Sequence, residues 1–371
     1  MASSFRPDWS GRLSILQSSL ARHRVDALVV STPLNLTYLT GFTGSAGLLV
    51  VAPERVSLIT DGRYDLVVRQ GIGAGSLAPV ALARVATRYD RTLAEVLTAA
   101  GASHVGFEPA HVTVGTLGQW QRACPGVTWV PLERTVERLR LIKDRAEIDV
   151  FRRGAALISR VAEALPGMVA VGRTEREVAD RLGEAILRAG FSRLAFPTIV
   201  ATGPNSALPH AVPGDRPIAR GDLVVLDFGG VLDGYCVDLT RMAAAGPVSV
   251  AAKSLFDAVF AAHAAAVQVV RPGIQTSEVD RAARTVLESR GLGDAFSHST
   301  GHGLGLEVHE APRVARADPE SPDVLEPGMV FTIEPGAYVE SIGGVRVEDD
   351  VLVTAGGCEV LTTASRDLLL V

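Results

Sequence analysis

Cysteine is scarce in this chain, and basic residues do not outnumber acidic ones. The three cysteines, Cys124, Cys236 and Cys358, are widely spaced and odd in number, which predicts neither a disulfide framework nor a zinc knuckle. The formal net charge is −5, from 36 basic and 41 acidic residues. A nucleic-acid-binding protein needs a basic surface, so we expect no nucleic acid partner.

Long apolar runs are also missing. The longest runs, such as residues 47–52, have the length of a strand and are too short to cross a bilayer. Residues 1–13 contain no apolar segment of the kind that a signal peptide has. We therefore expect no membrane contact. The lack of a disulfide framework makes the cytoplasm the default location.

A length of 371 residues predicts two domains, because one hydrophobic core rarely serves so long a chain. Residues 1–133 alternate short apolar runs with helical stretches, which is typical of an α/β domain. The expected strands are 26–31, 47–52, 55–60 and 104–107, and the expected helix is 93–100. Residues 134–150 are interpreted as a linker that enters a long helix, and residues 151–371 as the second domain.

The second domain repeats a series of motifs. Thr174 and Glu177 form a predicted capping box at the start of an amphipathic helix, and residues 273–279 resemble that segment. A His-x-x-Pro motif then occurs at 210–213 and again at 309–312. After each copy comes a glycine, an apolar strand with an acid at its end, and then a second acid. We interpret this pattern as two half-domains related by a pseudo-twofold axis.

The repeated acids are Asp227 and Asp238 in the first half, and Glu334 and Glu348 in the second. Facing strands would bring the four carboxylates together, where burial and like charge penalise their ionised forms. Divalent cations supply the missing countercharge, and His302 adds an imidazole from a glycine-rich segment. Such an oxygen-rich set suits Mn²⁺, with Co²⁺, Fe²⁺ or Zn²⁺ as alternatives. The five residues predict a dinuclear metallohydrolase site, in which paired ions activate a water and polarise a scissile carbonyl.

Each residue of this set also has a simpler interpretation. Asp238 would suit a turn, His302 a glycine-rich loop, and residues 348–350 a solvated run of acids. Residues 301–305 lack the Lys-Ser/Thr of a phosphate-binding loop and the strand-to-helix setting of a dinucleotide site. Five residues in repeat-related positions favour the metal centre over these separate explanations.

Further candidates accompany the ligands. His210 and His309 are suited to hydrogen-bond a tetrahedral oxyanion or to move a proton. Arg346 lies two residues before Glu348 and is expected on the same strand face. It either orients a carboxyl or carbonyl group of a ligand or pairs with an acid of the site. The histidines outside these motifs are interpreted as structural or surface residues: His23, His104, His111 and His263.

These motifs resemble the M24 peptidases, which have the pita-bread fold. The matching segments are 226–230, 234–241, 300–312, 326–336 and 344–349. The resemblance implies that Asp238 and Glu348 bridge two metal ions, that Asp227 binds one of them, and that His302 and Glu334 bind the other. It further implies that Glu334 is the general base and that His210 and His309 lie beside the substrate. His298 matches a histidine that is seen in the proline-specific members of the family.

The first domain narrows the choice within the family. Residues 35–47 and 60–64 resemble the creatinase-type N-terminal domain, which methionyl aminopeptidases usually lack. Creatinases have the domain but lack the metal ligands that are intact here. Xaa-Pro aminopeptidases and Xaa-Pro dipeptidases remain. The segments 42–45 and 61–64 look more like aminopeptidase P, although they would also suit the strands and turns of any such domain.

We therefore predict an α/β (α+β) protein with a creatinase-like N-terminal domain (1–133), a linker (134–150) and a pita-bread metallopeptidase domain (151–371). The expected activity is release of the N-terminal residue from peptides with proline second, with His298, Arg346 and Tyr338 on the substrate side and a homodimer as the assembly. The alternatives are a prolidase restricted to dipeptides, a metal-free amidinohydrolase, and a non-catalytic binding module.

Overall fold

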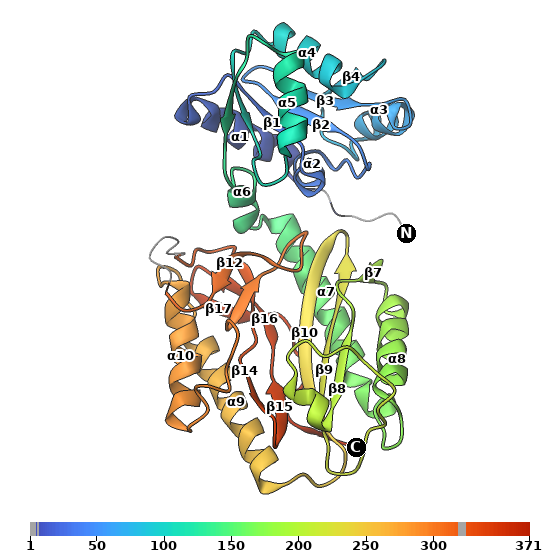
Figure 1. The fold of residues 1–371 in the computed structure, drawn as a ribbon, viewed down its shortest axis with the longest axis vertical. Coiled ribbons are helices and arrows are strands. Elements are labelled where there is room, and N and C mark those ends of the chain that lie inside the picture. The colour runs from blue at the N-terminus through green and yellow to red at the C-terminus, as the bar shows by residue number, and fades with distance from the viewer. Residues whose placement is uncertain (1–4, 6, 318–323) are drawn as a thin grey trace. The chain divides into compact units, whose positions relative to one another are not determined.

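The computed structural model describes residue 5, residues 7–317 and residues 324–371, and it divides the chain between Arg140 and Leu141. The first unit, residues 6–140, is a mixed sheet with helices (Figure 1). Its strands are β1 (Ala27–Val30), β2 (Leu48–Val51), β3 (Val56–Thr60), β4 (Ala81–Arg84), β5 (His104–Phe107) and β6 (Thr128–Pro131). Its helices are α1 (Trp9–His23), α2 (Pro33–Thr40), α3 (Asp65–Ala74), α4 (Tyr89–Ala99), α5 (Val114–Ala123) and α6 (Glu137–Leu141).

The sheet of the first unit has the strand order β4-β3-β2-β1-β5-β6. The four strands predicted from apolar runs occupy its centre, and the predicted helix is confirmed as α4, one turn longer at its start. The edge strands β4 and β6 were not predicted. Their residues are only partly buried, so they carry little of the apolar pattern that reveals a strand.

The second unit contains Phe5 and residues 141–371, and its described strands form two five-stranded sheets and one two-stranded sheet. Its helices are α7 (Arg145–Glu163), α8 (Glu175–Arg188), α9 (Val250–Val269) and α10 (Thr276–Ser289). The first sheet holds β7 (Arg193–Leu194), β8 (Ile199–Thr202), β9 (Leu223–Leu232), β10 (Tyr235–Ala244) and β18 (Leu369–Leu370). The second holds β11 (Gly301–Gly303), β12 (Glu310–Val314), β13 (Val330–Ile333), β16 (Asp349–Thr354) and β17 (Gly357–Val360), and a separate hairpin pairs β14 (Gly336–Val339) with β15 (Gly343–Arg346).

The two halves of this unit follow the same plan, as the repeat predicted. Helices α7 and α8 pack on the first sheet, and α9 and α10 pack against the second sheet and the hairpin. Helix α8 begins with the predicted capping box of Thr174 and Glu177. Helix α10 begins in a similar way, with the backbone N–H of Gln275 donating to Oε1 of Glu278 at 3.4 Å. The pita-bread fold expected from the sequence is the one observed.

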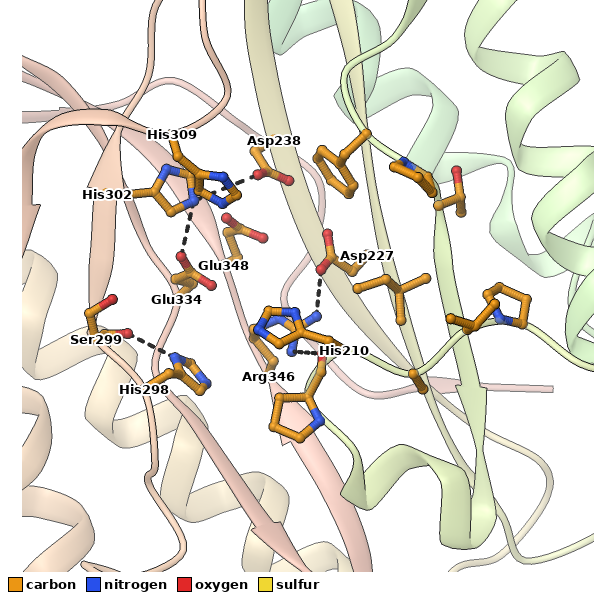
Figure 2. Close-up of a pocket in the computed structure, with 18 of the residues that line it drawn as sticks. His210, Asp227, Asp238, His298, Ser299, His302, His309, Glu334, Arg346 and Glu348 are labelled. Atoms are coloured by element: carbon orange, nitrogen blue, oxygen red, sulfur yellow. Dashed lines mark hydrogen bonds and ion pairs between the residues drawn. The ribbon is translucent and has the colours of Figure 1, made fainter. Parts of the chain in front are cut away.

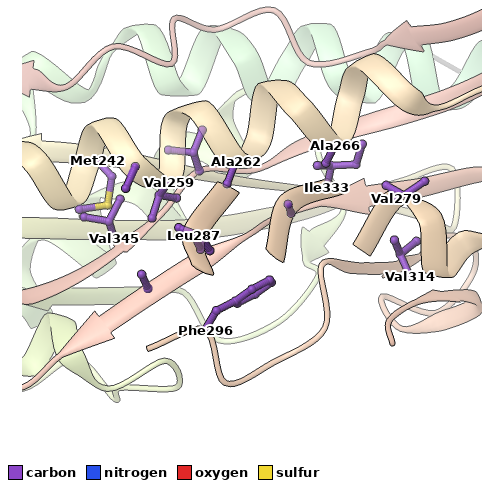
Figure 3. Close-up of a cluster of buried hydrophobic side chains, with 14 of the residues drawn as sticks. Met242, Val259, Ala262, Ala266, Val279, Leu287, Phe296, Val314, Ile333 and Val345 are labelled. Carbon is purple, nitrogen blue, oxygen red and sulfur yellow. The ribbon is translucent and has the colours of Figure 1, made fainter. Parts of the chain in front are cut away.

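The core of the second half lies between α9, α10 and the strands beneath them (Figure 3). Val259 and Ala262 of α9 and Leu287 of α10 are fully buried against Ile333 and Val345. Burying a side chain of the size of leucine contributes roughly 1.5–3 kcal/mol, so this cluster holds α9 on strands β13 and β15 and holds α10 against α9. Strand β13 ends directly before Glu334 and β15 ends at Arg346, and both residues were predicted as site residues.

Helix α9 is the longest helix of this unit, with 20 residues that are mostly apolar. Among the described residues it is the one helix that could cross a membrane by length and composition alone. Lys253, Asp257 and His263 interrupt its apolar residues, and no helix was predicted here from the sequence. Since its buried residues pack in the cluster of Figure 3, we assign it as a core helix.

One prediction of local structure was wrong. Asp227 was expected at the end of an apolar strand, yet it lies within the ten-residue strand β9. Asp238 lies within the ten-residue strand β10 and not in the turn that it would also have suited. Strand β9 continues past the acid because Gly229 and Gly230 follow it. A Cβ at Gly229 would lie 2.4 Å from the carbonyl oxygen of Val237, so the close pairing of the hairpin requires glycine there.

Candidate metal centre

Two acids and a threonine share one face of the β9–β10 hairpin. The register pairs Asp227 with Thr240 and Asp238 with Gly229. Directly paired residues, and residues two apart in a strand, point to the same side of a sheet. The carboxylates of Asp227 and Asp238 and the hydroxyl of Thr240 therefore face the second sheet together.

The second sheet supplies the other three predicted ligands. His302 is the middle residue of β11, Glu334 follows β13 directly, and Glu348 precedes β16 directly. Nε2 of His302 lies 3.2 Å from Oε1 of Glu334 and 3.9 Å from Oδ2 of Asp238. Asp238, His302 and Glu348 each offer a ligand atom, and these atoms lie within 4.8 Å of one another. The fold thus brings the five predicted residues from both halves to one place.

These residues line one cavity of about 690 Å³. Figure 2 shows His302, Glu334 and Glu348 of one half facing Asp227 and Asp238 of the other. The opposite wall is apolar and comprises Phe196, Pro197, Ile199, Pro209, Ala211, Val212 and Pro213. A site of this kind offers charged groups for chemistry on one side and an apolar surface for a ligand on the other.

Several carboxylate oxygens of the site have no partner within the described part of the chain. Oδ1 of Asp227, Oε1 of Glu348 and Oδ1 of Asp350 are buried and accept no hydrogen bond. Glu348 is 1 % exposed and Asp238 is 4 % exposed. Because buried charge without a partner is costly, these atoms fit the binding of divalent cations, which prefer carboxylate oxygen.

The pKa values of the carboxyl groups in the site are shifted because these groups are buried close to one another. Burial raises the pKa of Asp238 well above its ordinary value, and the charge of Glu348 raises it further. Burial, together with Glu334 and Asp227, likewise raises the pKa of Glu348. Glu334 differs: burial opposes ionisation, but the hydrogen bond and charge of His302 lower its pKa to about 2. Burial also raises the pKa of Asp227, so three acids oppose one another's ionisation, whereas Glu334 stays ionised beside the imidazole of His302.

Neighbouring side chains hold the acids in place. Thr240 donates to Oε2 of Glu348 at 2.6 Å, and the backbone N–H of Asp238 donates to Oδ2 of Asp350 at 3.2 Å. Arg346 donates to Oδ2 of Asp227 at 2.5 Å. Of the two roles that we considered for Arg346, its pairing with an acid is the one seen here.

Arg346 also begins a chain of hydrogen bonds. It donates to the hydroxyl of Tyr338 at 2.7 Å, and that hydroxyl lies 2.9 Å from Nε2 of His298. Because Nδ1 of His298 faces the carbonyl oxygen of Ser299, the proton belongs on Nδ1 and Nε2 accepts from Tyr338. Burial lowers the pKa of His298, which agrees with a neutral ring. Tyr338, predicted on the substrate side, does not line the cavity and lies behind His298 and Arg346.

The remaining histidines of the motifs face the cavity. His298, His210 and His309 all line it. The ring of His309 stands edge-on to that of His302, with the centroids 4.3 Å apart. Burial lowers the pKa of His309, and the charge of His302 adds to the effect. Both candidates for oxyanion binding, His210 and His309, are thus within one cavity with the acids.

The sequence did not reveal the residues beneath the site. Asp349 and Asp350 were allowed as a solvated run of acids, but both are fully buried. Asp349 contacts Arg241 at 2.8 Å and His263 at 3.0 Å, and it also pairs with Arg366. The available signal was the position of these acids at the start of the apolar segment 349–354, where an exposed charge is unexpected. Arg241 lies within β10.

This fold, with a cavity of acids and histidines, defines a metal-dependent hydrolase. The model of metallopeptidase family M24 matches residues 149–355, and that of the creatinase/prolidase N-terminal domain matches residues 12–142. The chain therefore belongs to metallopeptidase family M24 and is a metal-dependent peptidase. Membership implies divalent metal ions, which agrees with the unpartnered carboxylate oxygens.

Relatives resemble the chain over almost its whole length. The Xaa-Pro dipeptidase of Pyrococcus furiosus is 32 % identical, and the match covers 96 % of this chain and 99 % of that protein. The structure of an Xaa-Pro dipeptidase from Bacillus anthracis superposes with a TM-score of 0.93 at 33 % identity, covering 98 % and 100 % of the two chains. An X-Pro aminopeptidase from Thermotoga maritima gives a TM-score of 0.86 at 30 % identity, covering 94 % and 98 %.

We expect divalent metal to stabilise the protein more strongly as the pH rises. In the metal-free fold the raised pKa values of Asp238 and Glu348 mean that the folded state holds protons more tightly than the unfolded chain. Their contribution to stability is present below the ordinary carboxyl pKa and is lost as the pH rises through the raised values. Metal binding requires the deprotonated carboxylates. The bound cation also cancels the repulsion between the negative charges of these carboxylates.

The measurement is the rise in Tm when MnCl₂ is added to chelator-treated protein, compared at several pH values between about pH 5.5 and about pH 8. An Mn²⁺ concentration of about 100 times Kd adds about 2.7 kcal/mol to the free energy of unfolding. Asp238→Asn should remove the rise, whereas Asp257→Asn, in the exposed part of α9, should keep it. A rise in Tm that is the same at every pH would contradict this account.

Proposed function

We propose that this protein is an Xaa-Pro dipeptidase that hydrolyses the bond between the first residue and the proline of a dipeptide. The main support is the similarity, at about one-third identity and over both units, to proteins named Xaa-Pro dipeptidases. These relatives favour the dipeptidase alternative over the aminopeptidase that we had expected from residues 42–45 and 61–64. The X-Pro aminopeptidase from Thermotoga maritima keeps the second possibility as a runner-up.

In this proposal Asp227, Asp238, His302, Glu334 and Glu348 hold two divalent ions, and Mn²⁺ suits their donor atoms best. When bound, such ions polarise a carbonyl oxygen and lower the pKa of a water molecule. Elemental analysis of protein purified without chelator counts the ions. Protein that binds no divalent ion and is not activated by Mn²⁺ would overturn this part of the proposal.

The other groups bind the substrate and move protons. Glu334 is ionised, since its pKa is lowered to about 2, and it accepts the proton of the attacking water and passes it to the leaving nitrogen. His309 and His210 donate hydrogen bonds to the oxygen of the scissile carbonyl as negative charge develops on it. His298, fixed by Tyr338 and Ser299, faces the cavity beside the proline ring.

Peptide length distinguishes the two candidate functions. With Mn²⁺ present, we expect Ala-Pro to be cleaved with a kcat/KM at least about tenfold above that of Ala-Pro-Ala, which corresponds to about 1.4 kcal/mol in transition-state binding. Release of alanine is followed for each peptide, with Ala-Ala as a control for proline specificity. Preferential cleavage of Ala-Pro-Ala would assign the chain to the aminopeptidases.

The setting of the enzyme is also part of the proposal. A cytoplasmic location follows from the scarcity of cysteine, and short proline-containing peptides are the partners. We propose a homodimer, which light scattering of the purified protein tests directly: a mass of twice 39.0 kDa is expected.

A further inference from the structure

A buried glutamate outside the cavity contacts both ends of one cavity loop. Glu175 is the first residue of α8 and is 0 % exposed. Its Oε1 accepts from the backbone N–H of Thr202 at 2.8 Å, and its Oε2 accepts from that of Gly214 at 3.0 Å. The side-chain amide of Asn205 donates to both oxygens, at 3.0 and 3.2 Å.

The loop between these contacts forms the apolar rim of the cavity. Residues 203–213 carry His210, and Pro209 and Val212 beside it also line the cavity. His210 and Val212 are exposed, so packing restrains them little. The carbonyl oxygen of Pro209 accepts from Arg346 at 3.3 Å, which connects the middle of the loop to the pair of Arg346 with Asp227.

The choice of a carboxylate at this position has a physical reason. No cation among the described residues forms an ion pair with Glu175, and burying a charge in this way is costly. Three N–H donors converge on the two oxygens, one from Asn205 in the loop and two from the flanking residues Thr202 and Gly214. Only a group that accepts at both positions serves them all. Glutamine is nearly identical in shape but places an NH₂ where one donor now points. The geometry thus favours loop restraint over simple filling of space.

We propose that Glu175 is a positioning residue: its carboxylate clamps the ends of the 203–213 loop and so holds His210 toward the substrate. Glu175 does not line the cavity, so its influence on the reaction passes through the loop. The effect on turnover rests on the proposed function of His210, whereas the restraint of the loop does not. The two parts can therefore be tested separately.

Hydrogen exchange tests the restraint without any assay of activity. In Glu175→Gln, backbone amides of residues 202–214 should exchange about tenfold to a hundredfold faster, as expected for losing a hydrogen bond to a charged acceptor. Amides of α9 should be unchanged. Glu177→Gln is the matched control, because Glu177 lies on the same helix, is exposed, and caps the helix through a bond that glutamine can also make. Unchanged exchange in the loop of Glu175→Gln would overturn the proposal.

Kinetics test the connection to His210. Glu175→Gln should lower kcat/KM for Ala-Pro about tenfold or more, with the metal content unchanged, whereas Glu177→Gln should be within about twofold of the parent enzyme. In a His210→Ala background, Glu175→Gln should lower kcat/KM for Ala-Pro by less than about twofold. The imidazole that Glu175 positions is then absent, so a change in the loop has little further effect. An undiminished effect in that background would overturn the link to His210. Failure of the parent enzyme to cleave Ala-Pro would refute the proposed substrate. Hydrogen exchange would still test whether Glu175 restrains the 203–213 loop.

Discussion

Glu334→Gln should lower kcat by about a thousandfold while leaving the protein folded. A positioned general base typically contributes about 10²–10⁴ in rate, and Glu334 lines the cavity beside His302 as an ionised carboxylate, the form that can accept a proton. Glutamine preserves the shape and can still accept from Thr332, which now donates to Oε1 at 3.1 Å. It cannot take up a proton, so binding survives better than turnover.

The measurement is kcat and KM for Ala-Pro at saturating Mn²⁺, with circular dichroism and metal content recorded for the same samples. Glu340→Gln is the control, because Glu340 is an exposed acid shortly after the same stretch of chain. Near-normal turnover in Glu334→Gln would remove Glu334 from the mechanism. A loss of bound metal that matches the loss of rate would show that its main contribution is as a ligand.

Arg241→Met should lower the free energy of unfolding by about 3–5 kcal/mol, the range expected when one partner of a buried ion pair is removed. Arg241 donates to Oδ1 of Asp349 at 2.8 Å, to the carbonyl oxygen of Glu348 at 2.5 Å and to that of Ala364 at 2.8 Å. Methionine fills the space but satisfies none of these acceptors. Metal binding should weaken as well, because the backbone of Glu348 loses its anchor.

Urea unfolding, followed in metal-free protein, measures this loss. Arg152→Met is the matched control: Arg152 makes two hydrogen bonds to Glu359, but the pair lies at the surface, where about 1 kcal/mol or less is expected. Equal decreases in the free energy of unfolding of Arg241→Met and Arg152→Met would show that the buried ion pairs of Asp349 stabilise the protein no more than a surface pair does.

Much of the fold followed from local pattern. The central strands of the first unit are apolar runs, and the capping box of Thr174 and Glu177 was readable from residue types alone. Asp227 was predicted at the end of its strand, but β9 continues through Gly229 and Gly230, which pair with β10. The sequence pattern alone does not indicate that the glycines after Asp227 belong to the strand. The role of Asp349 was missed because its partner Arg241 lies 108 residues away, and no local pattern reveals such a pairing.

By itself, the sequence determined which residue types are available for metal chemistry, their order along the chain, and their division between two repeated halves. Tertiary structure alone decided that they converge, that Tyr338 lies behind the cavity, and that Glu175 reaches both ends of the loop with His210. The physical reason is that charge and hydrogen bonding act through space. Whether a carboxylate is ionised, paired or left with a free oxygen depends on burial and on neighbours from distant strands, and those neighbours meet only when the chain has folded.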